Sequence, residues 1–105
     1  MAVEMGLRSK ATGEYRVVPV ATLRSFREVW LPFCERLGQV WIPLFAGGAL
    51  TTVPSHVIPD VIHELQTLRA EAMTAPDVAW IAESIEAILA TFSETNPAEW
   101  EYDFG

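Results

Sequence analysis

The chain has 105 residues, of which half are apolar and a fifth are charged, and its formal net charge is −7. This length and composition predict one globular domain, residues 1–105, built around a single core, and they exclude a disordered chain. The acidic charge excludes direct binding of nucleic acids as an expected function, because like charges repel phosphate backbones.

The acidic charge is placed unevenly along the chain. Residues 1–69 carry seven basic and six acidic side chains, whereas residues 70–105 carry eight acidic side chains and no basic one. Such an asymmetry favours a basic protein partner, which the acidic surface would attract by electrostatic steering. An acidic surface that serves only solubility explains the same numbers, and both interpretations stay open.

No segment predicts a membrane span or an export signal. The longest uncharged run covers 16 residues, 39–54, and is broken by Pro43, Gly47 and Gly48, so it is too short and too irregular to cross a bilayer. We expect this run to be buried in the middle of the fold. The N-terminus has an acid at Glu4 and no apolar signal-peptide core, and Cys34 is the only cysteine. We therefore expect a cytoplasmic protein.

The first 22 residues predict an antiparallel hairpin. Apolar and polar residues alternate over residues 2–8, as in a half-buried strand. Turn residues around Gly13 follow, and β-type residues resume at Tyr15. Pro19 has no amide hydrogen, so the second strand is expected to end there or to lie at a sheet edge.

Apolar residues then recur at helical spacing over residues 22–37. Thr22 and Ser25 are alternative N-caps of this helix. Pro32 removes a backbone hydrogen bond, which predicts a kink or a restart near Leu31. Gly38 is expected to end the helix.

The central run is expected to contain a short strand or extended segment at residues 40–45, a turn at Gly47-Gly48, and another extended piece at residues 50–53. A helix capped by Ser55 and running to about Met73 should follow. The next helix should start within residues 74–77, where Pro76 and Asp77 suit a first turn. So short a connection predicts an antiparallel αα-hairpin.

The C-terminal tail is predicted to be a strand. Trp100, Tyr102 and Phe104 alternate there with acidic residues, and three aromatic side chains are too costly to leave in water. We expect this strand to pair with the N-terminal hairpin and to place Glu101 or Asp103 opposite a basic residue. The predicted fold class is thus α+β: a small, mainly antiparallel sheet packed against three helices, the last two forming the αα-hairpin.

One group of residues has the chemistry of metal ligands. His56, Asp60, His63 and Glu64 recur at helical spacing, so a helix would bring imidazoles and carboxylates near one another. The alternative is an ordinary solvated helix face. Ser55 with two of these residues does not give a catalytic triad, because neighbours on one helix cannot adopt its geometry. We therefore predict a protein that is not an enzyme and has no cofactor; the alternative is a small metal- or ligand-binding protein, or an enzyme, that uses His56, Asp60 and His63.

The last helix supplies the candidate binding residues. Trp80 projects away from its apolar stripe and is flanked by small residues, which is typical of an interface anchor. With Glu83, Glu86 and Glu94 it would contact a basic protein, so we predict a small acidic binding module, by analogy with inhibitor or immunity-type proteins of similar size and charge. Cover of Trp80 by the sheet or by the first helix is the alternative. A homodimer through Trp80 or a sheet edge is compatible with either function.

Overall fold

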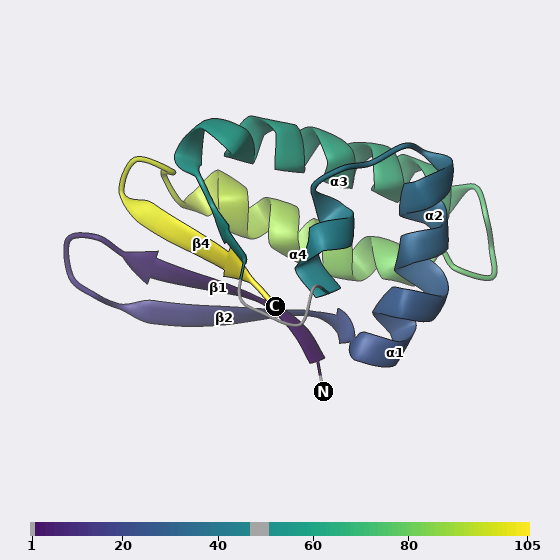
Figure 1. Cartoon of the computed structure of the whole chain (residues 1–105), viewed down its shortest axis with the longest axis horizontal. Coiled ribbons are helices and arrows are strands. Elements are labelled where there is room, and N and C mark those ends of the chain that lie inside the picture. The colour runs from purple at the N-terminus through teal and green to yellow at the C-terminus, as the bar shows by residue number, and fades with distance from the viewer. Residues whose placement is uncertain (1, 47–50) are drawn as a thin grey trace.

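The computed structural model describes residues 2–46 and 51–105 (Figure 1). Within these ranges, four strands form one antiparallel sheet in the order β2-β1-β4-β3. The strands are β1 (Ala2–Ser9), β2 (Tyr15–Thr22), β3 (Thr51–Val53) and β4 (Trp100–Phe104). The predicted hairpin and its pairing with the C-terminal strand are confirmed, and β3 extends the sheet beyond β4.

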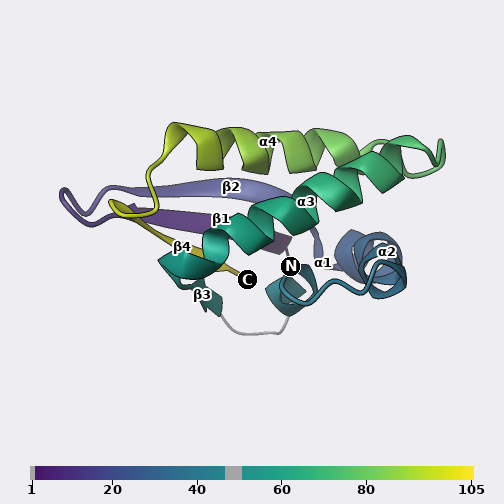
Figure 2. The same ribbon diagram turned by 90° about the horizontal axis from the view of Figure 1, so that it is seen from above.

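Three main helical segments complete the α+β fold. A continuous helical segment consists of α1 (Leu23–Ser25), a π-helical turn (Phe26–Trp30) and α2 (Leu31–Arg36). Two short 3-10 helices, Ile42–Ala46 and Ser55–Val57, flank β3, and the long helices are α3 (Ile58–Met73) and α4 (Ile81–Glu94). Figures 1 and 2 show α3 and α4 antiparallel over one face of the sheet, with α1 and α2 at its end, so the predicted αα-hairpin is confirmed.

The core lies between the sheet and the two long helices. Met5 and Leu7 of β1 are fully buried, because the alternation of β1 directs them to the face that the helices cover. Phe104 of β4 joins them and stacks on Phe45, with 3.7 Å between the ring centroids. Phe45 and Ile42 of the uncharged run are buried, but Val40 is 63% exposed and Leu44 is 46% exposed, so the expectation that this run is buried holds only in part. The predicted turn at Gly47-Gly48 lies outside the described residues.

The first helical segment accommodates Pro32 by widening one turn. The amide of Leu31 donates to the carbonyl of Phe26, five residues back, and this π-helical spacing lets the helix pass Pro32, which has no amide hydrogen. The α-helix then restarts at Leu31, as predicted. Thr22 is the N-cap: its hydroxyl accepts the Ser25 amide at 3.0 Å.

Gly38 ends α2 with a left-handed backbone at φ +68°, as predicted. The amide of Gly38 donates to the carbonyl of Glu35 at 3.2 Å, and the amide of Gln39 donates to that of Cys34 at 2.9 Å. This pattern is the Schellman motif, which satisfies the last carbonyls of a helix.

Three local predictions are wrong. Residues 40–45 do not form a strand, because Ile42–Ala46 is a 3-10 helix that tolerates Pro43 in its first turn. Ser55 makes no side-chain cap to α3 in the described chain. The helix α4 begins at Ile81 rather than within residues 74–77, because i→i+3 bonds such as Val78 to Ala75, at 3.0 Å, hold the preceding residues in turns.

The edge position of Pro19 is confirmed. β2 is an outer strand of the sheet, and Pro19 lies opposite Glu4 at a register shift that leaves Val20 as an extra residue in β2. Among the described residues, no helix is long and apolar enough to cross a membrane.

Candidate functional site

The exposed side of α4 carries three of the four predicted partner-binding residues. Positions 80, 83, 87, 90 and 94 recur every three or four residues, so they share one face of the helix. This face, which we call the α4 outer face, consists of Trp80, Glu83, Ala87, Ala90 and Glu94, and all five are exposed. The two alanines leave the surface between the two acids low and flat.

Trp80 is the aromatic residue of this face. Trp80 is 50% exposed, so no described element covers it completely. The indole Nε1 donates to the carbonyl of Asp77 at 3.2 Å, which restricts the ring before any partner arrives. Met73, at the other end of the α3–α4 connection, is 57% exposed. The tip of the αα-hairpin therefore presents two large apolar side chains to solvent.

Glu86, the fourth predicted residue, has a different role. Arg69 of α3 donates to its Oε1 through Nη2 at 2.6 Å and through Nε at 3.0 Å. This ion pair links the two helices and offsets the charge of Glu86. Glu83 and Glu94 make no ion pair within the part of the chain that the structure describes, so their charges are available to a partner.

The predicted metal-binding residues do not converge on one point. His56, Asp60 and His63 are all exposed. In residues 2–46 and 51–105, no group of three histidine, cysteine, aspartate or glutamate side chains could hold a metal ion. His56 lies in the 3-10 helix Ser55–Val57, whereas Asp60 and His63 lie in α3.

Glu64, the fourth member of that helix face, has a structural role that the sequence did not indicate. Its Oε2 accepts the Val40 amide at 2.9 Å, and its Oε1 accepts the amides of Trp41 and Ile42, each at 3.0 Å. The side-chain amide of Gln39 also donates to the Glu64 carbonyl at 2.7 Å. Glu64 thus connects residues 40–42, at the start of the Ile42–Ala46 helix, to α3 by hydrogen bonds.

The hollow beside Glu64 is small. Its volume is about 220 Å³, and Gln39 and His63 contribute polar groups to its wall. The Oε1 atom of Gln39 is buried and has no hydrogen-bond partner among the described residues. Because the Glu64 carboxylate already binds three amides, the hollow offers a ligand few free polar groups.

Cys34 is buried in the core. Burial, followed by the nearby negative charge of Glu64, raises the pKa of its thiol to about 12. The thiol is therefore protonated at neutral pH, and the protonated form is not the nucleophilic one.

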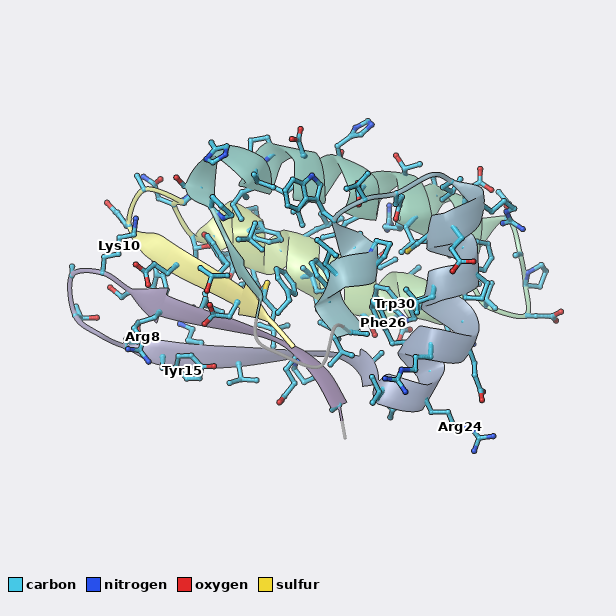
Figure 3. The ribbon with its side chains drawn as sticks, in the orientation of Figure 1. Arg8, Lys10, Tyr15, Arg24, Phe26 and Trp30 are labelled. Atoms are coloured by element: carbon cyan, nitrogen blue, oxygen red, sulfur yellow. The ribbon has the colours of Figure 1, made fainter. Side chains whose placement is uncertain are left out.

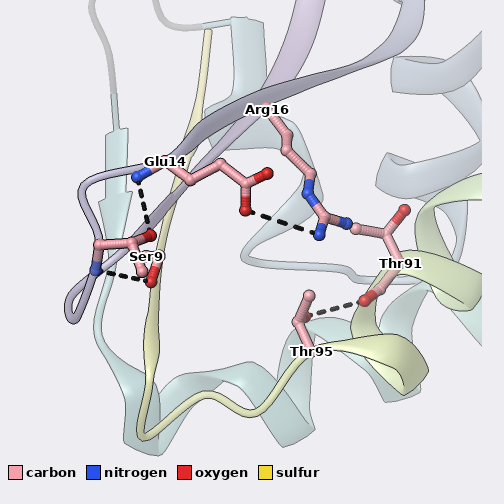
Figure 4. A network of polar contacts seen from close by, with 6 residues as sticks. Ser9, Glu14, Arg16, Thr91 and Thr95 are labelled. Atoms are coloured by element: carbon pink, nitrogen blue, oxygen red, sulfur yellow. Dashed lines mark hydrogen bonds and ion pairs between the residues drawn. The ribbon is translucent and has the colours of Figure 1, made fainter.

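Thr95 and Tyr102 form a buried polar pair that joins the end of α4 to β4. The Thr95 hydroxyl donates to the carbonyl of Thr91 at 2.8 Å (Figure 4). Its single hydrogen is then used, so the Tyr102 hydroxyl, 2.6 Å away, must donate to the Thr95 oxygen. Burial raises the pKa of Tyr102. Figure 4 also shows the more exposed ion pair between Glu14 and Arg16, at 3.8 Å.

No protein-family model, no curated protein and no solved structure matches this chain.

Proposed function

We propose that the chain is a protein-binding module whose α4 outer face docks on a basic surface of another protein. The observation that carries this proposal is the exposure of Trp80 beside Glu83 and Glu94, two carboxylates without an ion pair in the described chain. Interface hot spots are enriched in tryptophan, and a ring surrounded by flat, low surface can enter a partner's pocket.

The charges of this face favour a basic partner over a second copy of the chain. Two copies that met through their α4 outer faces would bring Glu83 and Glu94 of each close to those of the other, and like charges oppose such contact. A lysine- or arginine-rich surface would instead pair with both acids. If that basic surface is the partner's own active site, docking would block it, and the chain would act as an inhibitor or an immunity-type protein.

The proposal is tested by quantitative capture from a lysate of the source cells with immobilised protein. We expect the wild-type chain to retain a basic protein at about 0.1 M salt and to release it at about 1 M salt, where the Debye length falls from about 10 Å to about 3 Å. The double variant Glu83→Gln with Glu94→Gln should bind that protein roughly three- to tenfold more weakly, because each exposed ion pair contributes up to about 1 kcal/mol.

A matched control distinguishes the effect of the charges on the α4 outer face from the effect of the net charge of the chain. Glu35→Gln with Glu99→Gln changes the net charge equally, at exposed carboxylates on other elements, and should leave capture unchanged. Trp80→Ala should weaken binding by about 30-fold or more if the indole is a hot spot. Equal retention of the basic protein by wild type, the α4 double variant and Trp80→Ala would refute the proposal.

A further inference from the structure

The sheet has a second face that no described element covers. The two long helices lie on one face only (Figures 1 and 2). On the other face, Tyr15 is 50% exposed and Val17 is 47% exposed. Arg8, Tyr15 and Glu101 stand in one row across β1, β2 and β4, because Arg8 is paired with both other residues. We call this surface the bare sheet face.

On this face, the side chains of Arg8 and Tyr15 contact each other, and the end of the Tyr15 ring lies over Gly6. The guanidinium of Arg8 lies over the ring of Tyr15, 5.7 Å from its centroid. Figure 3 shows both on the side of the hairpin that points away from α3 and α4. A methyl group at Gly6 would collide with the Tyr15 hydroxyl, so the end of that ring lies above Gly6. The Tyr15 ring therefore covers the glycine and holds its hydroxyl near the middle of β1.

The charges on this face are divided between the strands. Arg8 and the exposed Glu4, which alternates to the same face, are on β1, whereas Glu101 and Asp103 are on β4. Neither Arg8 nor Glu101 makes an ion pair in the described chain, although the two residues are direct cross-strand neighbours. Asp103 accepts a hydrogen bond from Thr52 at 3.0 Å through Oδ1, which leaves its other oxygen without a bond among the described residues.

We propose that the bare sheet face binds a second copy of this chain, in a two-fold dimer whose axis runs parallel to the strands between β1 and β4. With this axis, β1 of one copy lies over β4 of the other, and each cross-strand row of residues faces the same row of the partner. Arg8 of each copy then faces the partner's Glu101. The row of Gly6 faces that of Asp103, so the Tyr15 hydroxyl of each copy meets the partner's Asp103 carboxylate.

Charge complementarity selects this occupant. A uniformly basic surface would face Arg8, and a uniformly acidic one would face Glu101 and Asp103. A second copy related by this axis instead offers the opposite charge at Arg8 and at Glu101, and a hydroxyl donor at Asp103. The apolar surfaces of Tyr15 and Val17 are buried in the same contact, as in aligned packing of two sheets.

The dimer is tested by sedimentation equilibrium over a wide range of protein concentration. Wild-type protein should populate a species with twice the mass of one chain, and its dissociation constant should rise between about 0.1 M and about 1 M salt, because four charges per dimer are paired. Arg8→Glu alone and Glu101→Arg alone should each weaken the dimer about tenfold or more, since each variant opposes like charges at two symmetric places.

Mixing the two variants gives the decisive measurement. Arg8→Glu carries two acids in this row and Glu101→Arg carries two bases, so an equimolar mixture should form a heterodimer at least as tight as the wild-type dimer. A defect in the folding of either variant alone would not be repaired by mixing. Arg27→Glu is the control, because Arg27 is exposed on the π-helical turn, outside the sheet, and it should leave dimerisation unchanged.

Three outcomes would overturn the proposal. Wild-type protein that keeps the mass of one chain at every concentration shows that the face has another occupant or none. A dimer that survives both single variants uses a different surface. Weakened variants that do not associate when mixed lose their dimer for a reason other than the Arg8–Glu101 contact. The proposal is independent of the α4 outer face, which belongs to the opposite side of the molecule, so either can fail alone.

Discussion

Replacing Glu64 tests how much of the fold depends on one carboxylate. Its two oxygens accept three backbone amides from residues 40–42, at 2.9 to 3.0 Å. Hydrogen bonds to a charged group contribute roughly 1.5–3 kcal/mol each when buried, and less when water can replace them. Glu64→Gln keeps one oxygen acceptor but loses the charge and at least one bond. We expect it to lower the free energy of unfolding by about 2–3 kcal/mol, a large part of the usual 5–15 kcal/mol.

Urea denaturation followed by tryptophan fluorescence would measure this loss. Glu35→Gln is the control, because it makes the same chemical change at an exposed carboxylate and should change stability by less than about 0.5 kcal/mol. Hydrogen exchange adds a local measurement: the amides of Trp41 and Ile42 should lose protection in Glu64→Gln, while those in the middle of β1 should keep theirs. A variant as stable as the control, with both amides still protected, would refute the role given to Glu64.

Two further predictions concern buried polar groups. Folding raises the pKa of the Cys34 thiol from about 9 to about 12, so the unfolded chain loses this proton at a lower pH than the folded chain. The stability that the protonated thiol contributes is therefore complete below pH 9 and is lost as the pH rises toward 12. The free energy of unfolding of Cys34→Ala should therefore fall less steeply than that of wild type above pH 9, by no more than about 1.4 kcal/mol per pH unit; parallel pH profiles would contradict the burial of the thiol. In the Thr95–Tyr102 pair, Thr95→Val should cost about 1–3 kcal/mol, because it leaves the buried Tyr102 hydroxyl without an acceptor, whereas Tyr102→Phe should cost about 1 kcal/mol, because Thr95 keeps its bond to Thr91. Thermal unfolding of both variants would show the order, and a more damaging Tyr102→Phe would reverse the assigned direction of the bond.

The strands and the long helices could be predicted because their patterns are local. The alternation of β1 and β4 and the helical spacing in α3 and α4 each arise from burial of one side of a regular element. The effects of Pro19 and Pro32 were also predictable, since both follow from a missing amide hydrogen.

The errors arose where a local signal allowed two conformations. The apolar residues around Pro43 suit a short strand and a 3-10 helix equally. The conformation of residues 40–42 depends on hydrogen bonds from their amides to Glu64, which lies 22 to 24 residues further along the chain. Pro76 and Asp77 suit a helix start, yet they also suit the turns that precede Ile81. No spacing in the sequence connects Glu64 with residues 40–42.

The candidate binding residues were only partly predictable for a similar reason. The helical spacing placed Trp80 away from the apolar stripe, but it left open whether the sheet or the first helix covers the ring. The pairing of Glu86 with Arg69 required the packing of α3 on α4, which the sequence does not specify residue by residue. The cross-strand pairing of Glu101 with a basic residue, Arg8, was predicted from the alternation of the last strand. The place of Tyr15 beside Arg8 was missed, because it depends on the register of the hairpin, which the sequence does not specify residue by residue.

The two outer strands affect how the folded protein behaves when it is crowded. An open strand edge is a template on which other chains can add strands and start fibrils. Here one edge strand contains Pro19 and a bulge, and the other, Thr51–Val53, has three residues followed by Pro54. Neither offers a long, regular row of free amides and carbonyls, so the folded chain should resist edge-to-edge aggregation even at concentrations at which its faces associate.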